Sequence, residues 1–459
     1  MKLPVLEEEA AYFSRSLFVP KSHVHGPALR GTLTFGEDSS GTPRVLVDEH
    51  PHHYEIPRSA LTAKQLENLG CRLVDTRPRL FDRVDFRPKN SFALRDNQLA
   101  AWEALKKADS GILNLACGKG KTVLGWLKAS HEGVPTLIVS PQKAHLDNWL
   151  AELERFFDCS DITIGWVQGK KFDYKVDVCL STVQTLARKA EEGKLPPDFL
   201  NRFGLAIYDE CHCMAAEFFS KAADVCIGKR IGLSATPNRT DRCEGIFFSH
   251  LGKVFFSDTT QDLKPTIYMI DTGVLYSKSE MKAMHDRAGQ LNIGLMRNVL
   301  AKNADRNALL DLVLQDCKKQ GRTTYVLSHS VDHVVDLHGR YPGSTVIHGG
   351  TKSDERLERL NGSDLVFATI GVGKEAYNRK DLDTLLLVTP FAARAHSAIT
   401  FQQSVGRILR EHPNKKPPVV FLFMDSQIDI CRGMIFSLMQ EAKRNGYEVK
   451  TNWRPGQLV

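Results

Sequence analysis

The sequence predicts an α/β protein with two tandem parallel-sheet domains and a small β-rich, α+β domain at the N-terminal end. The chain has 459 residues, 42% of them hydrophobic and 25% charged, which is enough for two or three domains with large cores. Short apolar runs alternate with amphipathic segments over residues 110–236, and a second such series begins at residue 323. This alternation is typical of parallel strands covered by helices on both faces.

Residues 1–91 differ from the rest of the chain, and we expect them to form the small N-terminal domain. Residues 29–61 contain short apolar runs separated by Gly, Pro and Asp/Ser turns, which predict short strands. The segment TAKQLENLG, residues 62–70, predicts a short helix. The histidines in EHPHHYE, residues 49–55, favour a polar turn over a metal site.

A basic segment, CRLVDTRPRLFDRVDFRPK, closes this domain at residues 71–89. Its cations and aromatic residues are Arg72, Arg77, Arg79, Arg83, Arg87, Lys89, Phe81 and Phe86. Two interpretations stay open. The segment either binds DNA phosphates and stacks on a strand, or its arginines are neutralised locally by Asp75, Asp82 and Asp85.

We expect the first α/β domain to span residues 92–260 and the second to span residues 261–459. The apolar runs that predict strands are ILNLA, TLIVS, VDVCLST, LAIYDE and RIGLSAT in the first domain, and TTYVLS, STVIHG, DLVFAT, TLLLVTP and VVFLFMD in the second. Leu146, Trp149, Leu150, Leu153 and Phe156 recur at helical spacing, which indicates ordinary core packing. Residues 263–320 are expected to be a largely helical link.

A glycine-rich loop follows the first predicted strand. In LACGKGKT, Gly118, Gly120, Lys121 and Thr122 have the spacing of a phosphate-binding loop, although Leu115 occupies the first glycine position of the strict pattern. Glycines let the backbone N–H groups face phosphate oxygens, while lysine adds charge and threonine ligates magnesium. The order of strand, loop and helix therefore indicates phosphate binding.

A second apolar strand, LAIYDE, ends in the acidic pair Asp209 and Glu210. At this position Asp209 can bind Mg²⁺, usually through water, and Glu210 can deprotonate the water that attacks the γ-phosphate of ATP. The acidic pair follows the phosphate loop by a further strand and helix. Together the two features indicate ATP hydrolysis.

Over about residues 92–425 the chain resembles the superfamily 2 helicases and translocases. Asp209, Glu210, Cys211 and His212 correspond to the D-E-x-H box of that family, and ACGKGKT corresponds to its phosphate loop, which does not require glycine in place of Leu115. The resemblance implies two RecA-like motor domains, with ATP and Mg²⁺ as cofactors and Thr122 and Asp209 as metal-binding residues. The implied ATP-binding residues are Arg95, Gln98, Gly118, Lys119, Gly120, Lys121 and Thr122, the first two in the adenine-reading motif LRDNQ.

Further motifs of the family imply contacts with the nucleic-acid backbone that do not read base sequence. The implied residues are Ser140, Pro141, Gln142, Ser181, Thr182 and Gln184 in the first motor domain, and Ser328, His329, His348, Gly349 and Thr369 in the second. His212, with Ser234 and Thr236 in SATPNR, is implied to couple hydrolysis to movement.

The motif QSVGRILR supplies Gln403, Arg407 and Arg410, whose family counterparts cross the interdomain cleft to the γ-phosphate. The chain departs from the family pattern at Ala376 and Asn378, where E-G-x-D is frequent, and at Lys119, where serine or threonine is frequent. None of these departures removes a catalytic charge.

The arrangement of a small N-terminal domain and two motor domains is most similar to phage helicases of the UvsW type, and more distantly to RecG and XPB-like translocases. This resemblance implies ATP-driven remodelling of branched or duplex DNA, by fork reversal and Holliday-junction branch migration, in recombination, repair or replication in a phage. Recombination or replication proteins are candidate partners. A 3′-to-5′ single-strand DNA or RNA helicase is the nearest alternative. A nucleotide-switched DNA-binding protein without turnover is a third, against which the intact Lys121, Asp209, Glu210, Arg407 and Arg410 argue.

We expect a cytoplasmic protein without membrane association, in the host cytoplasm if a phage encodes it. No apolar run approaches the roughly 18 residues of a membrane span, and the first 13 residues carry acids where a signal peptide needs an apolar core. The ten cysteines lack the paired spacing of a zinc site or a disulfide framework. The net charge of +7 permits a polyanionic partner but does not require one.

Overall fold

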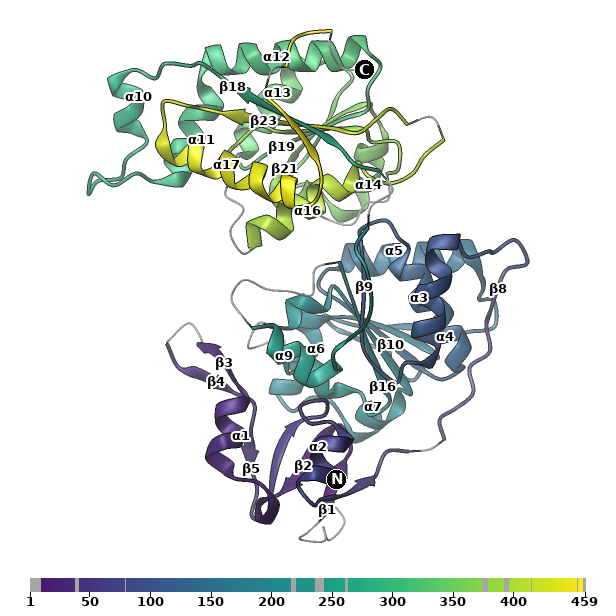
Figure 1. The fold of residues 1–459 in the computed structure, drawn as a ribbon. Coiled ribbons are helices and arrows are strands. Elements are labelled where there is room, and N and C mark those ends of the chain that lie inside the picture. Colours follow the sequence, from purple (N-terminus) through teal and green to yellow (C-terminus); the bar gives the residue numbers. More distant parts are fainter. Residues whose placement is uncertain are drawn as a thin grey trace. The chain divides into compact units, whose positions relative to one another are not determined.

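The computed structural model describes residues 10–37, 41–78, 80–215, 220–235, 243–260, 263–373, 379–391, 396–413, 415–451 and 453–456. The chain divides into two compact units, Met1–Thr259 and Thr260–Val459 (Figure 1). Each unit contains one large sheet of mostly parallel strands, and the first unit also contains a small mixed sheet. The predicted fold class is therefore confirmed.

The small sheet has the strand order β5-β6-β2-β1-β7. These strands are β1 Ala10–Phe13, β2 Ser16–Pro20, β5 Asp48–Glu49, β6 His53–Pro57 and β7 Arg72–Asp75, with a separate hairpin of β3 Thr34–Glu37 and β4 Pro43–Val45. Helices α1 Gly26–Thr32 and α2 Ala63–Asn68 accompany them. The predicted short helix is α2, and it begins at a capping box in which Thr62 accepts from the Gln65 backbone and Gln65 from that of Thr62.

The large sheet of the first unit has the order β13-β12-β14-β10-β15-β16-β9-β17, and all neighbouring strands are parallel except β12 and β13. The strands are β9 Ser110–Leu115, β10 Thr136–Ser140, β12 Ile164–Gln168, β13 Lys171–Phe172, β14 Val178–Thr182, β15 Leu205–Asp209, β16 Lys229–Ser234 and β17 Val254–Asp258. All five predicted strands are present. The strands that the sequence did not predict, β12, β13 and β17, lie at the sheet edges or next to one, and partly exposed side chains break their apolar runs.

Helices cover both faces of this sheet (Figure 1). They are α3 Asp96–Lys107, α4 Lys121–Glu132, α5 Lys143–Phe156, α6 Val183–Glu191, α7 Pro197–Arg202 and α9 Glu244–Leu251, with short 3₁₀ turns η2 Cys211–Ala215 and η3 Ala223–Val225. Leu105, Leu124 and Trp149 from α3, α4 and α5 pack in one buried cluster, and Leu186, Phe199 and Phe247 from α6, α7 and α9 pack in another. Because the strands are parallel, the loops after β9, β10, β14, β15 and β16 all leave from one edge of the sheet.

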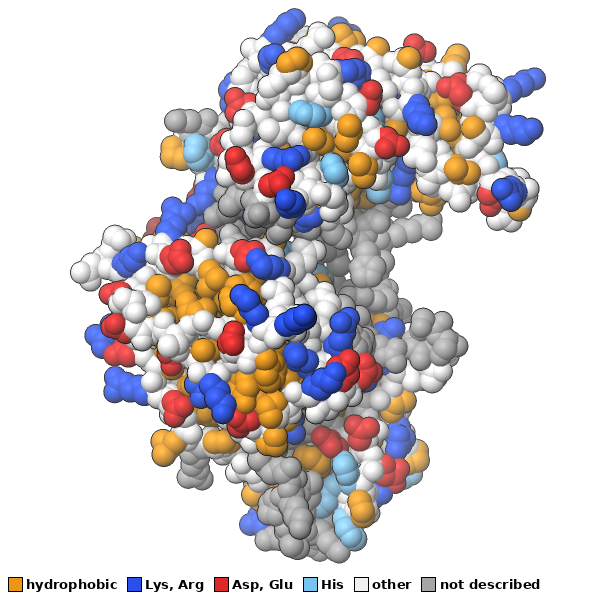
Figure 2. All heavy atoms as spheres, turned by 180° about the vertical axis from the view of Figure 1, so that it is seen from behind, with side chains coloured by type: hydrophobic (Ala, Val, Ile, Leu, Met, Phe, Trp, Pro, Cys, Tyr) orange, Lys and Arg blue, Asp and Glu red, His pale blue; other side chains and the backbone are white. Residues whose placement is uncertain are grey.

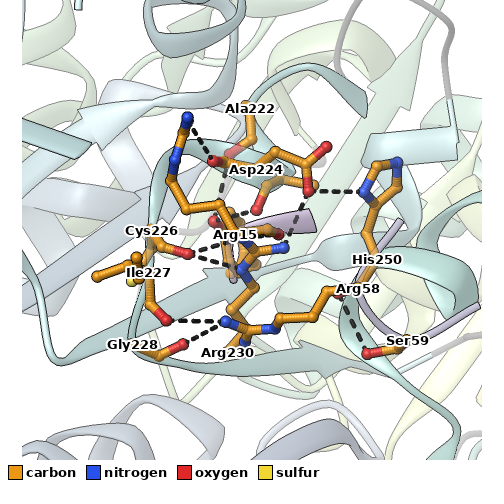
Figure 3. Close-up of polar contacts among 12 residues, drawn as sticks. Arg15, Arg58, Ser59, Ala222, Asp224, Cys226, Ile227, Gly228, Arg230 and His250 are labelled. Atoms are coloured by element: carbon orange, nitrogen blue, oxygen red, sulfur yellow. Dashed lines mark hydrogen bonds and ion pairs between the residues drawn. The ribbon is translucent and has the colours of Figure 1, made fainter. Parts of the chain in front are cut away.

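Two buried arginines attach the small sheet to the large sheet within the first unit (Figure 3). Arg58, which follows β6, donates to the carbonyl oxygens of residues 227 and 228 at 3.0 and 2.7 Å. Arg230, in β16, donates to the carbonyl oxygen of Arg15 at 2.7 Å and to the Asp224 carboxylate at 2.9 Å. Arg58 and Arg230 are only 1% and 0% exposed, so these bonds satisfy charges that water does not reach.

Two arginines of the basic segment 71–89 form ion pairs with neighbouring acids of the same segment. Arg77 pairs with Asp75 at 2.7 Å and Arg87 pairs with Asp85 at 3.2 Å. Phe86 is 4% exposed and packs against the Trp126 ring in the core of the first unit. Asp82 also pairs, with Arg202 of α7 at 3.5 Å, whereas Arg79 lies outside the described residues. These contacts favour local neutralisation, and they remove Phe86 from the aromatic residues available for stacking on DNA.

The sheet of the second unit has the order β20-β21-β19-β22-β23-β18-β24, and all of its strands are parallel. The strands are β18 Thr266–Asp271, β19 Thr324–Ser328, β20 Thr345–Ile347, β21 Leu365–Thr369, β22 Thr384–Leu387, β23 Val419–Met424 and β24 Glu448–Lys450. The five predicted strands are confirmed. The predicted link 263–320 was wrong in part, because β18 lies inside the sheet between β23 and β24.

The helices of the second unit are α10 Lys278–Ala283, α11 Ile293–Lys302, α12 Ala304–Lys319, α13 Val331–Arg340, α14 Ser353–Asn361, α15 Ile370–Gly373, α16 His396–Arg407 and α17 Asp429–Arg444. A fully buried ion pair joins α12 to the end of β23, with Arg306 Nε 3.1 Å from Asp425 Oδ1. Within the described ranges, no helix has both the length and the hydropathy that a bilayer crossing demands. All ten cysteines of the chain are free.

Candidate nucleotide-binding site

The phosphate loop, residues 116–120, connects β9 to α4 at the carboxyl edge of the first large sheet. Gly118 and Gly120 have φ angles of 86° and 78°, a region that side-chain-bearing residues rarely adopt. Lys121, the first residue of α4, donates through Nζ to the carbonyl oxygens of Leu115 at 3.0 Å and Ala116 at 3.4 Å. The predicted loop therefore has the required backbone conformation, and its lysine lies over the end of the strand.

Arg95 and Gln98, predicted to read adenine, contact the backbone of this loop. Gln98 donates to the carbonyl oxygen of Lys119 at 3.0 Å, and Arg95 donates to that of Gly118 at 3.1 Å. A Cβ atom on Gly120 would lie 2.2 Å from the Gln98 amide nitrogen, so glycine is needed at position 120 for space as well as for its φ angle. The structure thus brings these two residues and the phosphate loop together, and the adenine contact itself stays a prediction.

Asp209 ends β15, which is separated from β9 by a single strand. Its Oδ1 accepts from the backbone N–H of Glu210 and its Oδ2 from the indole N–H of Trp149, both at 3.0 Å. Burial and the neighbouring Glu210 charge raise the pKa of Asp209, while His145, the Trp149 hydrogen bond and Lys121 act in the opposite direction. The sequence pattern of a core helix gave Trp149 no role beyond packing, and periodicity alone contains no signal for this bond.

The residues present fit a magnesium ion with bound nucleotide phosphates. Asp209 provides a carboxylate and Thr122, in the first turn of α4, provides a hydroxyl, and Mg²⁺ prefers oxygen ligands of these kinds. Lys121 is among the charges that act on Asp209, which places cation and carboxylate in one electrostatic environment. No cluster of three or more His, Cys, Asp or Glu with metal-ligand geometry occurs among the described residues.

Glu210 has a strained backbone. Its φ angle of 48° is positive, and among the described residues it is the only such residue that is not glycine. Its Oε2 lies 3.4 Å from His212 Nδ1, which in turn lies 3.2 Å from the Ser234 hydroxyl at the end of β16. Strain of this kind, held in place by surrounding contacts, concentrates at functional sites. Thr236, the third predicted coupling residue, lies outside the described residues.

The predicted nucleic-acid residues of the first unit differ in accessibility. Ser140 and Ser181 are fully buried, and the Ser181 hydroxyl donates to the Val167 carbonyl oxygen at 2.6 Å. Thr182 is buried too, and caps α6 by accepting from the Thr185 backbone at 3.4 Å. The Ser181 and Thr182 hydroxyls therefore have structural roles in this conformation. The half-buried members of the set are Pro141, Gln142 and Gln184. Phosphate contacts by any of the six stay predictions.

The corresponding residues of the second unit show the same division. Ser328 and Thr369 are buried, and the Ser328 hydroxyl lies 3.1 Å from His333 Nδ1. The backbone N–H of His329 donates to the Thr389 hydroxyl, and burial lowers the pKa of His329 to about 3. His329 and His348 are half-buried and Gly349 is exposed, so these three are the more accessible members.

The predicted arginine pair lies at the C-terminal end of α16. Gln403 and Arg407 are one helical turn apart, and Arg410 follows just after the helix, with its carbonyl oxygen accepting from Lys415 at 2.8 Å. All three side chains of the motif are half-buried. Their approach to the nucleotide stays a prediction, and the departures from the family pattern at Ala376 and Asn378 lie outside the described residues.

Comparison with known proteins agrees with this site. Residues 91–239, which contain the phosphate loop and the acidic pair, match the family model of the type III restriction enzyme res subunit. Over this part the chain is similar to proteins of superfamily 2. The chain is 27% identical over 342 residues to the DNA 3′-5′ helicase XPB of Mycobacterium tuberculosis, a match that covers 70% of the chain but only 59% of that relative.

Two phage proteins are also similar to this chain. The probable helicase D10 of Escherichia phage T5 is 24% identical over 384 residues, with 80% of the chain and 78% of that protein covered. The crystal structure of T4 UvsW aligns over 96% of the chain and 99% of its own length, at 18% identity and a TM-score of 0.40.

Proposed function

We propose that the chain hydrolyses ATP and uses the energy to move along and remodel DNA. The observation that carries this proposal is the placement of the phosphate loop after β9 and of Asp209 and Glu210 after β15, at one edge of one parallel sheet. The similarity to superfamily 2 supports it. The alternative of a nucleotide switch without turnover is disfavoured, because Lys121, Asp209 and Glu210 are retained at this edge and the sequence also retains Arg407 and Arg410.

Each part of the site has a separate role in ATP hydrolysis. The backbone N–H groups of the loop and the N-terminus of α4 bind phosphate oxygens, and Lys121 adds a full positive charge. A magnesium ion held by Thr122 and Asp209 would neutralise charge on the phosphates. Glu210 accepts the proton of the attacking water. The positive φ angle of Glu210 and its contact with His212 fix the direction of its carboxylate.

We propose branched DNA as the preferred substrate, with fork reversal and branch migration of Holliday junctions as the activities. The sequence motifs that resemble UvsW-type helicases support this choice. The mycobacterial relative is named a DNA helicase and the phage T5 relative a probable helicase, which supports helicase activity. Lys and Arg side chains lie interspersed with Asp and Glu on the face in Figure 2. The motif residues are the proposed contacts to the backbone phosphates. A 3′-to-5′ single-strand helicase is the second candidate, favoured by the name of the mycobacterial relative.

The cytoplasm is the proposed compartment, of the host if a phage encodes the chain, and recombination or replication proteins are the proposed partners. Ten free cysteines, most of them buried, support a reducing environment.

The decisive experiment compares ATP hydrolysis in the presence of single strands, duplex, a fork and a four-way junction, each made of DNA and of RNA. We expect magnesium-dependent hydrolysis that the fork and the junction stimulate most, and no such preference among the RNA substrates. Absence of hydrolysis with every nucleic acid would contradict the motor function. Stimulation by single strands alone would favour the second candidate.

A further inference from the structure

A tryptophan holds one oxygen of the carboxylate that the proposed function assigns to magnesium. Trp149 Nε1 donates to Asp209 Oδ2 at 3.0 Å, across 60 positions of sequence. The other oxygen, Oδ1, accepts from the Glu210 backbone at the same distance. Each carboxylate oxygen keeps a second lone pair. The two donors together fix the plane of the carboxyl group and leave its remaining lone pairs for other ligands.

The indole itself has no freedom to turn away. Trp149 is 0% exposed, and its ring lies 5.3 Å from the ring of Trp126 at an interplanar angle of 67°. Trp126 donates through Nε1 to the backbone carbonyl oxygen of Trp149 at 2.8 Å. A Cβ atom on Gly125 would lie 2.4 Å from the Trp149 ring, so glycine in α4 makes the space that the ring fills. A buried indole N–H requires an acceptor, and here that acceptor is Asp209.

Trp149 also links two parts of the proposed site. It belongs to α5, which begins at Lys143 directly after the loop of residues 140–142 that is predicted to contact nucleic acid. A displacement of α5 would move the indole N–H, and with it the orientation of Asp209. Helices α5 and α4 pack together through Trp149 and Trp126. A displacement of α5 would therefore also displace α4, the helix that follows the phosphate loop.

We propose that Trp149 is a positioning residue that orients Asp209 for magnesium binding and ties that orientation to the nucleic-acid loop through α5. The inference rests on the proposed ATPase function of the site. Polar groups that hydrogen-bond to a metal ligand usually orient that ligand, and the loss of such a group lowers metal affinity or activity about 10- to 100-fold. In this protein we assign that role to the indole N–H of a core tryptophan.

The test removes one N–H and keeps the ring. In the full chain, Trp149 is replaced by 3-benzothienylalanine, whose sulfur stands in place of the indole N–H, and by Phe in Trp149→Phe. The matched control carries the same two replacements at position 126, where an equally buried indole donates to a backbone carbonyl. Mn²⁺ serves as the probe, and its affinity for each protein with bound ADP is measured by electron paramagnetic resonance without turnover.

We expect both replacements at 149 to weaken Mn²⁺ binding roughly 10-fold or more, and both replacements at 126 to leave it within about 2-fold of the wild type. ADP affinity in the absence of metal should be unchanged in all four. In steady-state ATPase assays, the 149 variants should require more Mg²⁺ and respond less to DNA. If the proteins changed at position 149 bound Mn²⁺ as tightly as those changed at position 126, the inference would be overturned.

The two proposals can fail separately. A wild-type chain that hydrolyses no ATP with any DNA contradicts the proposed function, while the Mn²⁺ comparison still decides the role of Trp149. Hydrolysis by the wild type, combined with normal Mn²⁺ affinity in the benzothienylalanine-149 protein, contradicts only the role of Trp149.

Discussion

The Lys119 ammonium of the phosphate loop lies 2.5 Å from the Asp258 carboxylate at the end of β17. The two side chains are only 6% and 22% exposed, and the Asp258 carbonyl oxygen also accepts from the Ala116 backbone at 3.0 Å. Asp258 is the last residue of the strand just before the second unit begins at Thr260. The lysine that departs from the usual family pattern therefore attaches the phosphate loop to the strand that leads into the next unit.

We expect Lys119→Met to destabilise the first unit by about 2 kcal/mol, because it leaves a partly buried carboxylate without its cation. Asp258→Asn should cost a similar amount. The double variant should cost clearly less than the sum of the two, since each single change already removes the shared interaction. Urea unfolding of the four proteins measures this coupling. Additive effects would mean that the ion pair does not stabilise the loop.

Lys121→Ala and Glu210→Gln should separate ATP binding from ATP hydrolysis. The first change removes a charge that binds phosphate, so it should weaken ATP affinity and hydrolysis together. The second keeps the shape of the side chain but removes the base, so ATP should still bind while turnover falls by roughly 10²-fold or more. Titration with a fluorescent ATP analogue and steady-state ATPase assays distinguish the two. An equal loss of nucleotide affinity in both variants would contradict the role given to Glu210.

Arg407→Ala should leave ATP binding largely intact and lower turnover by roughly 10³-fold, through lost charge compensation in the transition state. The variant should bind four-way junctions without converting them, because the motor no longer completes its cycle. Arg432→Ala is the control, since Arg432 is an exposed arginine of the same unit that pairs only with its helix neighbour Asp429 in the described structure. Junction conversion at a near-normal rate by Arg407→Ala would refute the proposed mechanism.

His333, which is buried, and His329, which is half-buried, should make the second unit sensitive to acid. Burial, together with Arg297 for one and Arg306 and Arg340 for the other, lowers the pKa of both His329 and His333 to about 3. The unfolded chain takes up these protons near pH 6.5, but the folded chain takes them up only near pH 3. Stability is therefore complete above about pH 6.5 and falls as the pH drops toward 3, by about 1.4 kcal/mol per pH unit for each histidine.

Urea unfolding at pH 6.5 and pH 5 measures this loss. His329→Gln and His333→Gln should each reduce the difference between the two pH values, whereas His412→Gln, at an exposed position of the same unit, should not change it. An unchanged pH dependence in both the His329 and the His333 variants would show that other groups cause the acid sensitivity.

The two parallel sheets and the residues at their carboxyl edges could be predicted from the sequence. Strands such as β10 and β15 are buried on both faces, so they appear as unbroken apolar runs, and a phosphate loop needs glycines at fixed positions within one short segment. Asp209 and Glu210 were identifiable for the same reason, since they end such a run. Edge strands such as β12 and β17 lack this signal, and β18 was assigned to the link.

The distant residues that complete the site could not be predicted, because their contacts form only when the chain is folded. Trp149 meets Asp209 across 60 positions and Lys119 meets Asp258 across 139, because the strand order places β10 beside β15 and β9 beside β17. The same applies to Arg58, whose carbonyl partners lie 169 and 170 positions away. In the sequence, Trp149 belongs to a set of apolar residues at helical spacing, and Lys119 lies in a glycine-rich loop. Their partners depend on how strands are ordered in the sheet, and that order is set by packing among segments that are not neighbours in the chain.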